Sequence, residues 1–264
     1  MPRSRAVDVD PQGIGRWYTD IDPPRDASLT THHAPLTMNH HDLSHPLETG
    51  VTGYPDDPPV DIERVATVAD DGYAVSRLAF GSHAGTHVDA PAHMLADGPT
   101  LDDFDLDTFH FRAVVADCRP LEAREPIDGA DLETAVGTDT TDVDLCICRT
   151  GWDAHWGTDR YLEHPYLTAD AADWLLERGL HVGIDALNVD PTPAPTSTDA
   201  AIPTDDEPTD YPFHLAMFAE ERLLLENLRN LEVLPTDRPF VVHAYPVSIA
   251  NADASPVRAV AILE

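Results

Sequence analysis

The chain has 264 residues, of which 42% are apolar, so it can build one domain with a full core and is marginal for two. Its 48 acidic residues outnumber 16 basic ones, all of them Arg, and give a formal net charge of -32. This charge excludes the basic surfaces that bind DNA, RNA or anionic membranes, and the apolar content argues against a disordered chain.

The acidity predicts a protein adapted to high salt. A large like charge keeps a folded surface soluble where salt screens repulsion, because the Debye length falls to about 3 Å at 1 M. Residues 1–10 lack an apolar signal stretch, and no run of about 18 apolar residues occurs, so we expect a cytoplasmic protein without a membrane span. Loss of structure or activity in dilute buffer would support the salt hypothesis, and full stability there would count against it.

The predicted elements follow a polar extension at residues 1–38 and belong to one domain at residues 39–264. A first ordered element is expected near Asp42. Residues 168–178 predict a helix that Thr168 caps and Gly179 ends, and three further helices are predicted at residues 101–104, 130–136 and 215–221. Strands are predicted at residues 65–68, 74–80, 113–117, 144–148, 182–184, 240–244 and 257–262. This mixture indicates an α/β or α+β domain.

The three cysteines are interpreted as core thiols in a reducing compartment. Cys146 and Cys148 are two apart in an apolar stretch, and this spacing is too short for a Cys-x-x-Cys zinc site. Cys118 leaves an odd number and no second pair. The cysteines therefore predict no disulfide framework and no zinc site.

Residues 191–212 are rich in Pro, Thr and Asp and show no apolar period. A loop this long inside a compact domain is usually functional or disordered. Because it leads directly to His214, a candidate site residue, we expect this loop to cover the substrate pocket and to contribute little to the core.

The densest chemical signal lies at residues 81–93. On a helix, His83 and His87 would share a face and Asp89 would not, and Gly85 and Pro91 both oppose a helix. In an extended chain, all three polar side chains project to one side. Two imidazoles and a carboxylate on one side suit zinc, manganese or iron, which accept nitrogen and oxygen ligands. The run therefore predicts a metal site.

The run His83-Ala-Gly-Thr-His-Val-Asp-Ala-Pro-Ala-His93 resembles the signature of the cyclase family, metal-dependent hydrolases that include bacterial arylformamidases. Further segments are similar in the same order, from about residue 40 to the C-terminus. They begin at Asp42, Tyr54, Arg149, Gly183 and His214. The resemblance implies a swivelling β/β/α single domain of the α/β class, assembled as a homodimer or homotetramer.

The resemblance also implies a metal centre. His83, His87 and Asp89 would hold one divalent ion, and Asp89 would bridge to a second ion completed by His214 and Glu226. Zinc is the expected ion and manganese the alternative, with one or two ions bound. In one straight helix, His214 and Glu226 would lie about 18 Å and 120° apart. The segment between them must therefore break into a helix to about residue 221 and an extended stretch at residues 222–227.

Other residues receive roles from the resemblance as well. His93 is implied as the general acid and base, and a further metal ligand is the alternative reading. Tyr54 is implied as the substrate-side aromatic, where the best-known formamidases carry Trp. Trp152 and Trp156 are read equally as pocket or core residues. No role is assigned to the histidines at positions 32, 33, 40 and 41.

The implied activity is hydrolysis of an amide or formamide bond in a small molecule. The first expectation is conversion of N-formylkynurenine to kynurenine and formate. The alternatives are hydrolysis of a cyclic amide or lactone, as in isatin-hydrolase-like relatives, and a non-catalytic metal- or ligand-binding protein on the same scaffold. The candidate acid and base His93 disfavours the last alternative.

Overall fold

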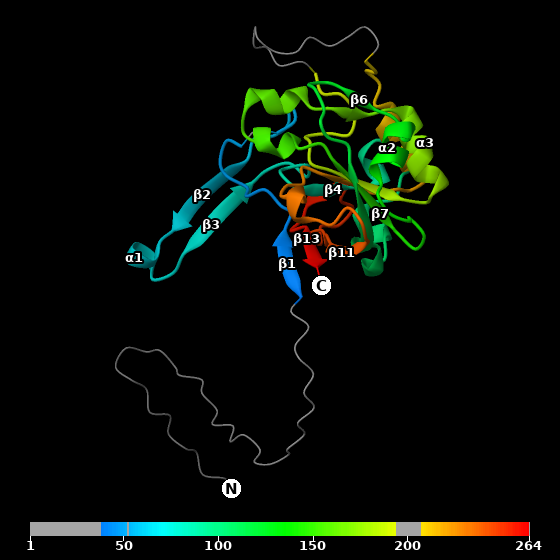
Figure 1. Cartoon of the computed structure of the whole chain (residues 1–264). Helices are drawn as coiled ribbons and strands as arrows, with labels where there is room; N and C mark the ends of the chain where they lie inside the picture. The colour runs from blue at the N-terminus through cyan, green and yellow to red at the C-terminus, as the bar shows by residue number, and fades with distance from the viewer. Residues whose placement is uncertain (1–37, 52, 194–206, 264) are drawn as a thin grey trace, which may run out of the picture. The chain divides into compact units, whose positions relative to one another are not determined.

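The computed structural model describes residues 38–51, 53–193 and 207–263, so all but the last residue of the predicted extension lies outside it. One mixed sheet of nine strands dominates the structure (Figure 1). Its strands are β1 (Asn39–Asp42), β4 (His87–Asp89), β5 (His110–Asp117), β7 (Leu145–Arg149), β9 (His181–Ile184), β10 (Leu224–Glu226), β11 (Phe240–His243), β12 (Ala254–Pro256) and β13 (Val260–Leu263). Their order is β1-β13-β11-β5-β7-β9-β10-β4-β12. The central strands β5, β7, β9 and β10 are parallel, and the flanking strands pair antiparallel.

The remaining elements surround this sheet. Two small sheets pair β2 (Asp61–Ala66) with β3 (Val75–Ala79), and β6 (Pro126–Ile127) with β8 (Tyr166–Leu167). The helices are α1 (Val68–Asp71), α2 (Gly129–Ala135), α3 (Ala169–Glu177) and α4 (Pro212–Ala219). The 3-10 turns are η1 (Pro91–His93), η2 (Leu101–Asp103), η3 (Leu106–Phe109), η4 (Trp152–His155), η5 (Asp159–Glu163) and η6 (Leu231–Val233). Figure 1 shows the β2–β3 hairpin extending away from the large sheet. In the described residues, no helix combines the length and apolarity needed to cross a bilayer.

The sheet is buried on both faces, because alternate residues of its central strands enter two separate cores. Val114 and Cys146 pack with α2, α3 and α4 on one face. Val115 and Ile147 pack on the other face, inside the curl of the sheet. The amide of Leu43 donates to the Ala259 carbonyl, and the Arg229 amide donates to the Leu43 carbonyl. The first bond joins chain that follows β1 to chain just before β13. The second joins it to chain that follows β10, although β1 and β10 are far apart in the strand order.

Most predicted elements are confirmed. The Thr168 side chain caps α3 by accepting the Ala171 amide at 3.3 Å, and Gly179 follows with a φ of 70°. The segment from His214 to Glu226 breaks as predicted, with α4 ending at Ala219 and β10 following. Cys146 and Cys148 are buried and Cys118 is half-buried, all as free thiols. The mixed α/β single-domain class is confirmed as well.

One local prediction was wrong. The strand predicted at residues 65–68 is instead the end of β2 followed by the start of α1, because the Thr67 side chain accepts the Asp70 amide and starts a helix. His40 and His41 belong to β1 and pair with β13. Because the residues around these histidines are polar, the sequence did not predict this edge strand.

Candidate metal centre

The β4–β10 ladder places three acidic or imidazole side chains on one face of the sheet. Glu226 lies directly opposite His87 in the antiparallel register, and Leu224 lies opposite Asp89. Cross-strand partners and alternate residues share a face, so His87, Asp89 and Glu226 project together. Leu224, their neighbour on this face, belongs to the core beneath the helices. The three side chains therefore face the helical layer.

The fourth member of the cluster, His214, comes from α4 in that layer. Asp190 holds the start of this helix: its carboxylate accepts the backbone amides of Phe213 at 3.1 Å and His214 at 2.9 Å. These amides have no partner inside the helix. The same carboxylate accepts the Nδ1–H of the His214 ring at 2.7 Å. Asp190 thus fixes both the helix and the direction of the imidazole.

His83 reaches the cluster by another route than the predicted extended run. The chain turns at residues 82–86 before β4 begins, and Gly85 has a φ of 65°. A Cβ atom on Gly85 would lie 2.6 Å from Leu47 Cδ2, so both the backbone angle and the space require glycine. The turn brings the Nδ1 atom of His83 to 2.9 Å from Asp89 Oδ1. The three predicted ligands are therefore together, and a turn rather than strand alternation places His83.

Each of the three histidines presents one ring nitrogen to the cluster and uses the other to contact a fixed acceptor. The Nδ1–H of His87 donates to the Gly85 carbonyl at 2.8 Å, since a carbonyl can only accept. Its Nε2 atom therefore carries a lone pair. The remote nitrogens of His214 and His83 face the carboxylates of Asp190 and Asp253. These partners aim the near nitrogens at the centre of the cluster, as the outer partners of metal-binding histidines do.

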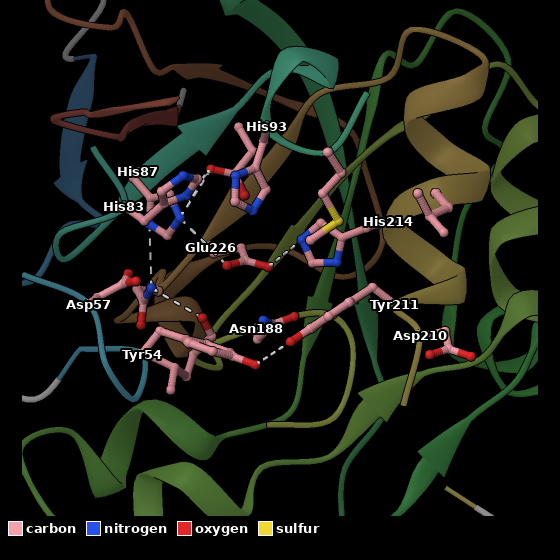
Figure 2. A pocket seen from close by; sticks show the side chains of 15 residues that line it. Tyr54, Asp57, His83, His87, His93, Asn188, Asp210, Tyr211, His214 and Glu226 are labelled. Carbon is pink, nitrogen blue, oxygen red and sulfur yellow. Dashed lines mark hydrogen bonds and ion pairs between the residues drawn. The ribbon is translucent and has the colours of Figure 1, made fainter. Parts of the chain in front are cut away.

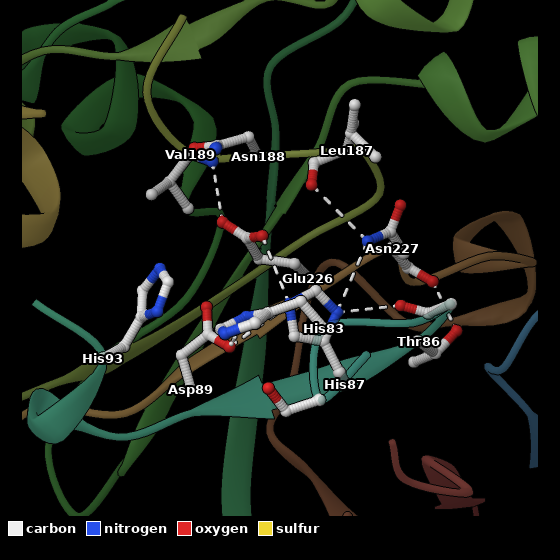
Figure 3. A network of polar contacts seen from close by, with 12 residues as sticks. His83, Thr86, His87, Asp89, His93, Leu187, Asn188, Val189, Glu226 and Asn227 are labelled. Carbon is white, nitrogen blue, oxygen red and sulfur yellow. Dashed lines mark hydrogen bonds and ion pairs between the residues drawn. The ribbon is translucent and has the colours of Figure 1, made fainter. Parts of the chain in front are cut away.

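The near nitrogens face carboxylate oxygens across short gaps, shown for His83 and His87 in Figure 3 and for His214 in Figure 2. His87 Nε2 lies 3.2 Å from Asp89 Oδ1 and 3.5 Å from Glu226 Oε2. His214 Nε2 lies 3.6 Å from Glu226 Oε1. Among the described residues, His87 Nε2 and both Asp89 oxygens are buried without a hydrogen-bond partner. Lone pairs that face one another in a buried site need a cation, so the donor set fits a divalent metal ion.

The electrostatics of the cluster lead to the same requirement. Burial, and then the charge of Asp89, raise the pKa of Glu226 well above its usual range. Burial lowers the pKa of His83, but the Asp89 carboxylate more than offsets it and raises that pKa to about 10. A proton on His83 thus supplies positive charge beside Asp89 when no ion is bound. A bound divalent ion would replace that proton and favour ionisation of Glu226 beside Asp89, whose own pKa, despite burial, the neighbouring histidines hold well below its usual range.

The ligand atoms form two groups that share Asp89. His83, His87 and Asp89 make one group, and Asp89, His214 and Glu226 make the other, with the ligand atoms of each within 4.8 Å of one another. These are the two ligand sets that the resemblance implied for a pair of ions. A third group combines His83 and His93 with Asp253.

His93 lies beside the cluster, in η1, where Pro91 starts a tight turn after β4. Its ring centroid is 4.0 Å from that of His83, and its Nδ1 lies 3.7 Å from Asp253 Oδ2. Burial, partly offset by Asp89, lowers the pKa of His93 to about 4. His93 belongs to neither group that contains Asp89, and its ring lines the cavity with the ligands (Figure 2).

The ligands form one wall of a cavity of about 490 Å³, within the range of about 300–1,000 Å³ typical of small-molecule sites. Tyr54 stands in this cavity, and its hydroxyl lies 2.8 Å from the hydroxyl of Tyr211 (Figure 2). Trp152 and Trp156 do not line it. Trp152 is buried in the core, and Trp156 stacks on His45 with ring centroids 4.0 Å apart.

No role was predicted from the sequence for Asp190, Tyr211 or Asp253. Tyr211 follows a Pro-rich segment, and Asp253 lies far along the chain from the histidines. A carboxylate is a common outer partner of a metal-binding histidine, but Asp190 precedes His214 by 24 positions, so nothing local in the sequence indicated this pair. The other two carry no local signal.

The segment predicted to cover the site is only partly described, and residues 194–206 lie outside the described residues. Both described ends are held by Arg124. Its guanidinium forms a buried ion pair with Glu207 and donates to the Thr192 carbonyl at 2.9 Å. Asp210 and Tyr211 line the cavity. The ends of the segment therefore contribute buried contacts that the composition did not predict.

Comparisons with known proteins agree with this geometry. The family model described as "Putative cyclase" matches residues 41–191. Kynurenine formamidase of Bacillus cereus is 30% identical over 224 residues, covering 83% of this chain and 95% of the relative, and that of Bacillus anthracis is 29% identical with the same coverage. Isatin hydrolase A from Ralstonia solanacearum superposes with a TM-score of 0.72 at 25% identity, covering 86% of this chain and 92% of the other.

Proposed function

The chain belongs to the cyclase family and is a metal-dependent amide hydrolase, and on this premise we propose that it hydrolyses an N-formyl aromatic amine such as N-formylkynurenine to formate and the free amine. The observation that carries the proposal is the set of buried lone-pair nitrogens and carboxylates along one wall of a cavity that also contains two tyrosines. The 30% identity to a kynurenine formamidase, covering 95% of that relative, supports the choice of substrate.

His83, His87, Asp89, His214 and Glu226 would hold the metal. When bound, a divalent ion polarises a carbonyl group and lowers the pKa of water. Asp190 and the Gly85 carbonyl keep their histidines in one tautomer and one direction throughout turnover. The amide of Val189 donates to Glu226 Oε1 at 2.9 Å and holds that carboxylate in place.

His93 would carry the proton. Hydrolysis removes a proton from the attacking water and adds one to the leaving nitrogen, so that formamide and water become amine and formate. His93 lines the cavity, and the neutral imidazole that its lowered pKa implies can accept the first proton and donate it to the nitrogen. Tyr54 and Tyr211 lie where they can contact an aromatic substrate, and the apolar Met94, Leu187 and Leu215 line the same cavity.

A substrate panel tests the proposal. The purified protein, supplied with zinc or manganese, should release formate from N-formylkynurenine, followed by the absorbance of the free arylamine. Saturable binding of the substrate without turnover, with metal present, would refute the enzymatic role.

The superposition on isatin hydrolase A favours a second candidate, hydrolysis of a cyclic amide. The same panel separates the two, because ring opening of isatin consumes water without releasing formate. Turnover of isatin alone would select this candidate and reject the formamidase assignment.

We propose zinc as the resident ion and manganese as the alternative, because the ligands are a mixture of imidazole nitrogen and carboxylate oxygen. Metal analysis of the native protein would give both the identity and the number of ions. We further propose that the protein assembles as a homodimer or homotetramer and that its folded state depends on molar salt. Light scattering across a salt series tests both in one experiment.

A further inference from the structure

Asp253 is held rigidly against the strand that carries the metal ligands. It directly precedes β12, whose Ala254 pairs with Asp89 of β4. Its own carbonyl accepts the amide of Ala90 at 2.8 Å. The backbone of Asp253 is therefore fixed to the end of β4 by bonds that do not involve its side chain, so a side-chain substitution leaves them in place.

The carboxylate of Asp253 lies between two imidazoles. Its Oδ2 atom is 3.0 Å from His83 Nε2 and 3.7 Å from His93 Nδ1, and Ser82 Oγ donates to it at 3.4 Å. The other nitrogen of His83, Nδ1, faces Asp89 at 2.9 Å. A carboxylate accepts the Nε2–H of His83 and leaves the Nδ1 lone pair directed toward Asp89.

We propose that Asp253 is a positioning residue of the metal centre: it holds His83 in the Nε2–H tautomer, with Nδ1 toward the ion, and keeps the His83 and His93 rings in contact at their interplanar angle of 47°. The inference rests on the proposed metal site, and it concerns a residue outside the implied ligand set. His87 and His214 have corresponding partners in the Gly85 carbonyl and Asp190. With Asp253, every histidine in the ligand set has an outer acceptor that selects its tautomer.

A rival role for Asp253 is direct ligation, because its carboxylate, His83 and His93 can form a ligand group of their own. In that arrangement the Nε2 atom of His83 would face the ion, and its Nδ1 would face Asp89 across the ring. The two roles differ in what removal of the carboxylate does to the number of bound ions.

The experiment measures zinc binding to apoprotein by competition with a chromophoric chelator, together with the visible spectrum of the cobalt-loaded protein. Asp253→Ala should bind the ion about 10–100-fold more weakly, the usual effect of removing an outer partner of a metal-binding histidine. It should keep the wild-type number of ions, and the cobalt spectrum should shift. The zinc affinity of Asp253→Asn should lie between those of wild type and Asp253→Ala, because the amide oxygen of Asn still accepts the Nε2–H of His83. Asp107→Asn, at an exposed site on η3 outside the cavity wall, is the charge-matched control and should match wild type.

Three results would overturn the proposal in different ways. If the wild type binds metal and Asp253→Ala has the same metal affinity and the same cobalt spectrum, the positioning role is refuted and the metal centre stands. Loss of one whole ion with unchanged affinity for the remainder would make Asp253 a ligand instead. A wild type that binds no divalent ion would refute the metal centre itself, and the positioning role with it. The melting temperature of each variant shows whether a change in metal binding comes from a folding defect instead.

Discussion

The Nε2 atom of His87 lies 3.2 Å from the Oδ1 atom of Asp89, two residues further along β4, and the two side chains are buried. The Nδ1–H of His87 is committed to the Gly85 carbonyl, so no imidazole proton lies between the two atoms in this tautomer. Strand alternation forces the side chains onto one face. A cation between them converts repulsion into coordination, and this relationship underlies the first prediction.

Replacing His83, His87 or Asp89 by Ala should remove metal and activity together, because each supplies a direct bond to the ion. Metal content by elemental analysis and formate release should be measured on the same purified samples. Retention of stoichiometric metal in all three variants would show that the ion binds elsewhere.

Replacing His93 by Asn should separate metal binding from proton transfer. The variant should keep its fold and metal but lose about 10²–10⁴-fold in kcat, the usual range for general acid–base catalysis. Its pH–rate profile should also lose one limb. Loss of metal in step with activity would instead make His93 a ligand, the alternative left open by the sequence.

The hydroxyl pair of Tyr54 and Tyr211 should affect substrate binding more than chemistry. Tyr211 has a φ of 52°, a left-handed conformation that is uncommon outside glycine and often occurs at functional sites. Tyr211→Phe should raise KM by about 2–10-fold, as expected for one neutral hydrogen bond, with kcat nearly unchanged. Tyr54→Phe should have the same effect, and the double variant should add little, since either change breaks the same bond. Additive effects would mean that the hydroxyls act independently on the substrate.

The ion pair of Arg124 and Glu207 should stabilise the folded chain. Both side chains are at most 6% exposed, and removing one partner of a buried pair typically costs about 3–5 kcal/mol. Arg124→Met should lower the free energy of unfolding by about that amount, measured by denaturant titration. Arg124→Met combined with Glu207→Leu should recover most of the loss, because no buried charge is then left unpaired. A single variant as stable as wild type would contradict the prediction.

The free energy of unfolding should fall in mild acid because His181 resists protonation in the folded protein. Its Nδ1 accepts the Leu223 amide at 2.8 Å, so this atom cannot carry a proton, and burial lowers the pKa of the ring to about 4. The unfolded chain, with a pKa near 6.5, binds the proton first as pH falls. The contribution of His181 to the free energy of unfolding is therefore fully present above about pH 6.5. It is lost as pH falls from about 6.5 to about 4, a decrease on the order of 3 kcal/mol.

The matched variant for this test is His181→Asn, whose amide oxygen can still accept the Leu223 amide but takes up no proton. The advantage of wild type in free energy of unfolding should shrink as pH falls from 6.5 to 4. An advantage that stays constant over this range would show that His181 binds a proton in the folded protein as readily as in the unfolded chain.

Elements whose signal is local could be predicted from the amino-acid sequence alone. The cap and stop of α3, the central strands and the break between His214 and Glu226 follow from propensity, apolar spacing and helix geometry, which act over a few residues. The pairing of His87 with Asp89 also followed from local geometry, because side chains two apart on a strand share a face.

The distant groups that complete the site are brought together by strand register and packing, which local patterns do not reveal. Glu226 meets His87 through strand register, His214 arrives on a helix held by Asp190, and Asp253 reaches His83 from 170 positions away. His83 itself depends on a turn around Gly85 packed against Leu47, and not on the extended run that its spacing suggested. Register and packing depend on the whole core, so the spacing of residues along one segment carries no record of them.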